Sequence, residues 1–151
     1  MRTEVLSHMN KHSQSCIVVS YAEAVAENVV TRHALEKNTI EARVGEHLSI
    51  DFVNDFLTEN NFHRTDFVFE PGQFAIRGGI VDVYSYAYEL PFRIEFDGNK
   101  IESIRSFDPV TQLSEKNLHF VTVIPNIQTE MQQNVTESFF KFLPENTLIW
   151  T

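Results

Sequence analysis

Two arginines on short predicted strands are the residues of this sequence best suited to do chemistry. Arg77 and Arg93 each follow an apolar residue. A guanidinium group is planar, binds a carboxylate through two parallel hydrogen bonds and is weakly hydrated, which suits a protein-docking surface. The alternative is that Arg93 only pairs with Glu102 across a hairpin, a surface contact worth about 0–1 kcal/mol. Residue types alone leave both interpretations open.

Four carboxylates on neighbouring predicted strands could form a pair for general acid and base chemistry. They are Glu70, Asp82, Glu95 and Asp97. Carboxylates on half-exposed strands are more often solvated, and the sequence carries no nucleophile motif of the hydrolase type. We therefore expect that this chain by itself is not an enzyme.

Gly72, Gly78 and Gly79 do not form a phosphate-binding loop. In that motif four residues separate the first glycine from Gly-Lys-Ser or Gly-Lys-Thr. Counted from Gly72, Arg77 stands where the second glycine would be. We expect no nucleotide cofactor in this chain. Gly78 and Gly79 instead predict a bulge or a close backbone approach.

The histidines give little support for a metal site. His8 and His12 lie four residues apart, which could bring both rings to one helical face, but no third ligand is evident. The other four histidines show no ligand spacing. We expect no metal to be bound.

Composition indicates a globular chain that does not work by holding nucleic acid. Its 151 residues are 42% hydrophobic and carry a net charge of −9, and residues 39–124 hold seven Lys or Arg against fourteen Asp or Glu. Nucleic-acid affinity is built largely from Lys and Arg, so this charge argues against it. The single cysteine, Cys16, and the lack of a long apolar run indicate a cytoplasmic protein that is not in a membrane. A monomer is expected.

The middle of the chain predicts an α+β domain in which a mainly antiparallel sheet packs on one helix. Ser49 caps that helix, which ends near Asn60-Asn61. The predicted strands are 39–44, 67–69, 74–77, 80–86, 92–96, 100–107 and 120–124.

A hairpin is predicted around Asp97-Gly98, with these two residues as its loop. That register would place Ile94 opposite Ile101 and Arg93 opposite Glu102. One face would be apolar, with Phe92, Ile94, Phe96 and Ile101. The alternation slips after Ser103, so a bulge is expected there.

Both ends of the chain predict parts of an α/β layer. A buried strand at 16–20 and a helix at 21–30 are expected before the middle domain. A helix at 135–143 and a strand at 147–150 are expected after it.

Residues 70–108 resemble a segment shared by the excision-repair helicase UvrB and the transcription-repair coupling factors. The matching elements are Glu70-Pro71-Gly72-Gln73-Phe74, Arg77 to Val83, Glu89-Leu90-Pro91, Arg93 to Phe96 and Ile101 to Asp108. UvrB tends to have Arg-Gly-Asp where this chain has Arg77-Gly78-Gly79, so the coupling factors are the more similar family. Three positions depart from the family pattern: Asp97 replaces a phenylalanine, Tyr84-Ser85 replaces Phe-Pro, and Asn61-Phe62 replaces Gly-Tyr.

The resemblance implies a protein-binding module that recruits UvrA to RNA polymerase stalled at a DNA lesion. It implies a UvrA-interacting domain at 39–124, inserted between parts of a degenerate helicase-like domain at 1–38 and 125–151. The implied partner-binding residues are Arg77 and Arg93, then Phe96, whose phase also fits the core, and Asp97 in the place of the family aromatic. The longer parent protein would use ATP and magnesium and would contact RNA polymerase and DNA through other domains. Domain 2 of UvrB and an unrelated enzyme domain are the alternatives.

Overall fold

The computed structural model describes residues 9, 17–31, 38–126, 136–143 and 147–149. The chain divides into two compact units, Asn38–Asn126 and a unit formed by Met1–Lys37 with Ile127–Thr151. The central unit begins one residue before the predicted range 39–124 and ends two residues after it.

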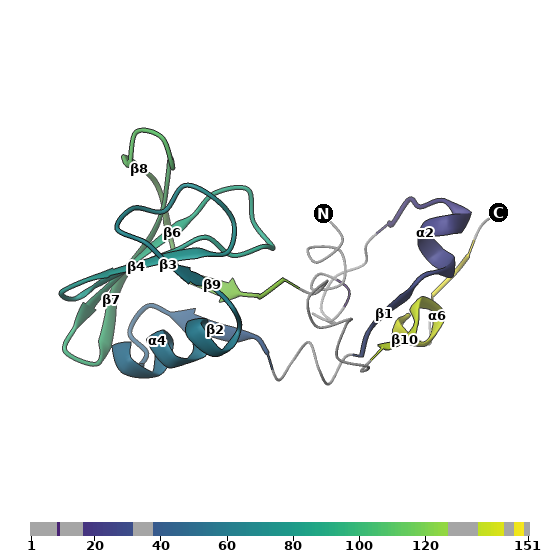
Figure 1. The fold of residues 1–151 in the computed structure, drawn as a ribbon, viewed down its shortest axis with the longest axis horizontal. Coiled ribbons are helices and arrows are strands. Elements are labelled where there is room, and N and C mark those ends of the chain that lie inside the picture. The colour runs from purple at the N-terminus through teal and green to yellow at the C-terminus, as the bar shows by residue number, and fades with distance from the viewer. Residues whose placement is uncertain (1–8, 10–16, 32–37, 127–135, 144–146, 150–151) are drawn as a thin grey trace. The chain divides into compact units, whose positions relative to one another are not determined.

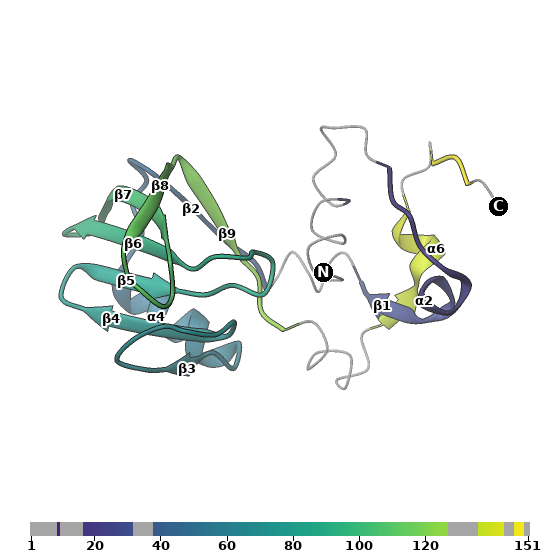
Figure 2. The same ribbon diagram turned by 90° about the horizontal axis from the view of Figure 1, so that it is seen from above.

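The central unit is an α+β domain dominated by an antiparallel sheet, as the sequence predicts (Figure 1). Its elements are β2 (Ile40–Arg43), α4 (Ile50–Glu59), β3 (His63–Arg64), β4 (Gln73–Arg77), β5 (Ile80–Val83), β6 (Phe92–Asp97), β7 (Lys100–Phe107), β8 (Ser114–Leu118) and β9 (Phe120–Val123). Six strands form one sheet in the order β3-β4-β5-β6-β7-β8, in which only β3 and β4 are parallel. Figure 2 shows β3 to β7 following one another across this sheet, and β2 pairs separately with β9.

One face of the six-stranded sheet forms the main hydrophobic core with α4, β2 and β9. The sheet contributes alternate residues of its strands, which is the period expected when one face is buried. The buried members are Ile40, Ala42, Val53, Leu57, Phe62, Phe74, Val81, Val83, Phe92, Ile94, Phe96, Ile101, Ile104, Val121 and Val123. Because one face is used for this core, the polar residues in between point to the other face.

The ends of α4 explain one departure from the family pattern. Ser49 caps the start, accepting from the Phe52 amide at 3.5 Å. At the other end Asn61 has φ +60, and the amides of Asn61 and Phe62 donate to the Thr58 and Leu57 carbonyls at 3.1 and 2.9 Å. This is a Schellman motif, which needs a left-handed residue, so Asn61 can take the place of the family glycine.

Several predicted strands were misplaced. Residues 67–69 form no strand, and His63–Arg64 pairs with β4 instead. The strand predicted at 80–86 ends at Val83. Strand β8 was missed because its residues are mostly exposed and polar and its pairing with β7 is made by the backbone.

The hairpin forms, but in a different register from the one predicted. Asp97 pairs with Lys100, so the loop is Gly98-Asn99, and Gly98 has φ +59. Positive φ at the first loop residue alone is the pattern of a type II′ turn. The bulge lies at Glu102, which has no partner residue on β6, whereas it was predicted after Ser103. With this register Arg93 lies opposite Arg105 and not opposite Glu102.

The terminal unit contains short elements that differ from those predicted. Helix α2 (Ala22–Ala26) ends early, and β1 (Asn28–Val30) pairs with β10 (Thr136–Ser138), which precedes α6 (Phe139–Phe142). The predicted helices at 21–30 and 135–143 were therefore partly wrong, because β-branched residues at 29–30 found a distant strand partner. Residues 17–20 and 147–149 form no strand, and Cys16 and Trp150 lie outside the described residues.

Gly79, the second glycine after β4, lies in a close backbone contact, as predicted, whereas Gly78 has open space around it. A Cβ atom at Gly79 would lie 2.8 Å from the Phe96 carbonyl oxygen, and the Phe96 amide donates to the Gly79 carbonyl at 2.8 Å. We expect Gly79→Val to lower the free energy of unfolding by more than about 1 kcal/mol, because β5 and β6 must separate to admit the side chain. Chemical denaturation measures this loss. Gly78→Ala, in open space at φ +59, is the control for backbone strain alone, expected to cost about 1–2 kcal/mol. Wild-type stability in Gly79→Val would contradict the expectation.

Candidate functional site

Five charged side chains occupy the sheet face opposite α4, and we call this set the arginine face. It consists of Arg77 on β4, Asp82 on β5, Arg93 and Glu95 on β6, and Arg105 on β7. Strand register places them together, because Asp82 lies opposite Arg93 and Arg93 lies opposite Arg105.

Asp82 is the centre of the arginine face. Its side chain is fully buried, and it accepts from Arg93 Nε at 2.7 Å and from Arg93 Nη2 at 2.9 Å. Arg77 Nη2 donates to the same carboxylate. A buried carboxylate is costly unless charged donors surround it, so the two arginines explain how strand β5 tolerates Asp82 between Val81 and Val83.

Arg77 is the more accessible of the two arginines. Its side chain is 39% exposed, its Nη1 donates to the Asp66 carbonyl at 2.6 Å, and its guanidinium lies 5.5 Å from the centre of the Phe67 ring. Both oxygens of Asp82 are already bound by Arg93, so Arg77 can engage a further carboxylate without leaving Asp82 unpaired.

Arg93 has a larger structural role. Its side chain is 17% exposed and its guanidinium lies 4.6 Å from the centre of the Phe107 ring. The hydrogen bonds to Asp82 raise the pKa of Arg93, while burial opposes that shift and the charges of Asp82 and Glu95 add to it. The fork of Arg93 is therefore already used inside the domain.

A second charge pair extends the arginine face toward β7. Arg105 Nη2 donates to Glu95 Oε1, and Ser103 Oγ donates to Glu95 Oε2 at 2.7 Å. These five side chains are three guanidinium groups and two carboxylates, whereas residues 39–124 carry twice as many acidic as basic residues. The arginine face is thus a local cationic excess on an acidic domain, which favours an acidic partner.

The structure does not bring all four sequence-predicted site residues together. Phe96 is 9% exposed and belongs to the main core, on the other face from the arginines. Asp97 is exposed at the end of β6, next to the residue whose amide bonds Gly79. Arg77 and Arg93 alone share a carboxylate. Partner contact through any of the four stays a prediction.

The carboxylates considered for catalysis do not form a pair. Asp82 and Glu95 are each engaged by arginines, while Glu70 and Asp97 are exposed. Within the described ranges, no three His, Cys, Asp or Glu side chains are grouped to hold a metal ion, and His8 and His12 lie outside those ranges.

Sequence reasoning missed Asp82 as the residue that holds both arginines, and it missed Arg64. A lone aspartate between valines was the available signal for Asp82, because an acid in an apolar strand must find a cation. Arg64 lies on β3 and lines a hollow of about 490 Å³ together with Thr65, Asp66, Phe67, Ile76 and Arg77. No local sequence signal placed Arg64 beside Arg77.

A small second core lies beside the arginine face, where the Arg93 guanidinium packs on the Phe107 ring. It comprises Val68, Ala75, Tyr84 and Phe107. The hydroxyl of Tyr84 donates to the Glu89 carbonyl, and burial, followed by the negative charge of Glu89, raises the pKa of Tyr84 above its usual value.

No helix among the described residues is long and apolar enough to cross a bilayer.

Comparison with known proteins finds relatives over most of this chain. The family described as the UvrB interaction domain matches residues 40–128. The chain is 31% identical over 124 residues to the transcription-repair-coupling factor of Bacillus subtilis, covering 82% of this chain and 10% of that protein. It is 29% identical over 124 residues to that of Myxococcus xanthus, covering 82% and 10%. It is 37% identical over 103 residues to that of Staphylococcus aureus strain MSSA476, covering 68% and 8%. The chain thus spans about a tenth of the length of these relatives.

Proposed function

This chain belongs to the UvrB interaction domain family, and from that premise we propose that it is a docking module for UvrA within a transcription-repair coupling factor. The observation that carries the proposal is the pair of arginines held on one sheet face by the buried Asp82. The Arg77 guanidinium is held by Asp82 and by the Asp66 carbonyl, so its remaining N–H donors have an orientation that is set before binding, which lowers the entropic cost of docking.

We propose that Arg77 makes the principal contact with an acidic group of UvrA. Its side chain is 39% exposed, against 17% for Arg93. Arg93 acts mainly by holding Asp82, which in turn holds Arg77. This division of roles differs from the expectation that both arginines bind the partner.

The role of the parent protein is a wider proposal. It would displace RNA polymerase stalled at a lesion and deliver UvrA there, in the bacterial cytoplasm, with ATP, magnesium and DNA bound through other domains. Two observations favour a coupling factor over domain 2 of UvrB: the relatives are coupling factors, and this chain has Gly78-Gly79 after Arg77.

Binding of purified UvrA to the immobilised 151-residue chain tests the docking function. We expect saturable binding with one UvrA site per chain. A labelled DNA duplex at about 100 mM salt is the parallel test, and we expect no affinity beyond the 10⁻⁴ M range of weak non-specific binders. Absence of UvrA binding, or micromolar and salt-sensitive DNA binding, would contradict the proposal.

A further inference from the structure

We propose that the docking surface continues from Arg77 onto an aromatic shelf formed by Phe67 and Phe69, and that it receives a segment of UvrA in which a carboxylate lies beside bulky apolar side chains. This inference rests on the proposed function. It adds the chemistry of the partner segment. It also gives a role to Phe67 and Phe69, to which the family resemblance gave none.

The two rings of the shelf are exposed side by side. Phe67 is 54% exposed and Phe69 is 53% exposed, and their ring centres lie 6.5 Å apart. Val68 between them is fully buried in the second core. The chain therefore turns one apolar residue inward and holds its two aromatic neighbours outward.

Hydrogen bonds fix the shelf in this arrangement. Thr65 Oγ1 donates to the Phe67 carbonyl at 2.9 Å, and the Phe69 amide donates to Gln73 Oε1 at 2.9 Å. Gln112 Nε2 donates to the Val68 carbonyl at 3.2 Å from a different loop. A backbone that is already ordered loses less entropy when a partner covers its side chains.

The loop that carries Gln112 exposes further apolar side chains. Val110 and Leu113 in this loop are 81% and 68% exposed. Asp108 orders the loop by accepting from the Val110 and Thr111 amides at 2.9 and 2.7 Å. The bonds from Thr111, first from its amide and then from its hydroxyl, hold the pKa of Asp108 below its usual value. The Asp108 carboxylate that orders the loop is therefore charged at neutral pH.

Cations beside the shelf specify an acidic occupant. Arg64 and Arg77 line the hollow next to Phe67, with Asp66 as the opposing charge. Arg77 lies over the Phe67 ring at 5.5 Å, so the cationic and apolar parts are continuous. Exposed apolar groups next to arginine are typical of interface anchors, and an acidic and apolar segment would satisfy both parts at once.

Variants of the shelf test this inference by their affinity for UvrA and by its salt dependence. We expect Phe69→Ala to weaken binding at least about tenfold and to leave the salt dependence unchanged, since only apolar contact is lost. We expect Arg64→Ala to weaken binding and to reduce the salt dependence, because a charge contact is lost. Phe67→Ala should resemble Phe69→Ala, and Phe67→Leu should retain part of the apolar contact.

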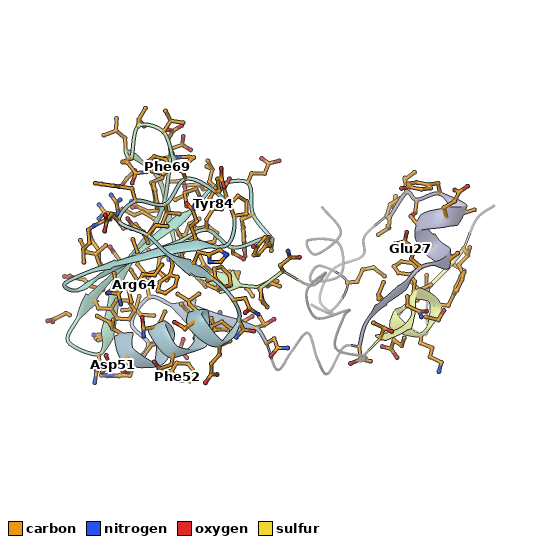
Figure 3. All side chains as sticks on the ribbon, in the orientation of Figure 1. Glu27, Asp51, Phe52, Arg64, Phe69 and Tyr84 are labelled. Carbon is orange, nitrogen blue, oxygen red and sulfur yellow. The ribbon has the colours of Figure 1, made fainter. Side chains whose placement is uncertain are left out.

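Phe52→Ala is the matched control. Phe52 is a phenylalanine with the same exposure, 53%, but it lies on α4, on the other side of the sheet from Phe69 (Figure 3). We expect wild-type affinity in this variant and similar melting temperatures in all the phenylalanine variants, because every replaced ring is half exposed.

Three outcomes would overturn the inference. Wild-type affinity in Phe67→Ala, Phe69→Ala and Arg64→Ala, with UvrA binding intact in the wild type, would leave the docking function standing without the shelf. Concentration-dependent dimerisation of the wild type that Phe69→Ala abolishes would identify a second copy of this chain as the occupant. No UvrA binding by the wild type would instead reject the proposed function itself.

Discussion

Replacing Asp82 with alanine is expected to lower the free energy of unfolding by about 3 kcal/mol, the lower end of the cost of breaking a buried ion pair. The fully buried carboxylate accepts two bonds from Arg93 and one from Arg77. Without it the two guanidinium groups repel each other near the second core. The loss stays at the lower end because Arg77, 39% exposed, can turn toward water. Urea denaturation of wild type and Asp82→Ala measures it.

Asp97→Ala is the control for the loss of one carboxylate. Asp97 is exposed at the end of β6, so its replacement should change stability by no more than about 0.5 kcal/mol. If Asp82→Ala were as stable as Asp97→Ala, Asp82 would not hold the arginine face together.

The role of Asp82 changes how arginine variants must be interpreted. Truncating Arg93 removes both bidentate bonds to a buried carboxylate and leaves Arg77 as its charged partner. Arg93→Ala is therefore expected to be destabilised. Arg77→Ala is the cleaner probe of docking, because Arg93 still satisfies Asp82.

The main core could be predicted from sequence because it depends on local alternation. Phe92, Ile94 and Phe96 on β6 and Ile101 on β7 all lie in the predicted apolar face. Alternation with a period of two residues is visible within a single strand. The capped start of α4 at Ser49 is similarly local, and the structure has it as predicted.

The candidate site was predicted only in part because it depends on how separate strands pair. The predicted hairpin register assigned Glu102 to Arg93, whereas the actual partner is Asp82 on β5, reached through β5–β6 pairing. A shift of the loop from Asp97-Gly98 to Gly98-Asn99 was enough to change every opposite residue. Residues 67–69 were predicted as a strand because three apolar residues in a row do not reveal which of them is buried. In the structure only Val68 of the three enters the second core, and Phe67 and Phe69 are exposed.

Replacing Arg77 with alanine is expected to weaken UvrA binding about 30-fold, corresponding to the roughly 2 kcal/mol of an arginine anchor at an interface. The melting temperature should change little, because Asp82 keeps its two bonds from Arg93. Arg77→Lys should also bind clearly more weakly, since lysine keeps the charge but loses the fork. Lys116→Ala on β8 is the control, an exposed cation outside the arginine face.

Titration calorimetry of UvrA with wild type, Arg77→Ala, Arg77→Lys and Lys116→Ala tests the docking account most directly. We expect wild-type affinity in Lys116→Ala, a clear loss in Arg77→Lys and the largest loss in Arg77→Ala. All four proteins should melt at similar temperatures. Wild-type affinity in Arg77→Ala would contradict the account and place the UvrA contact away from the arginine face.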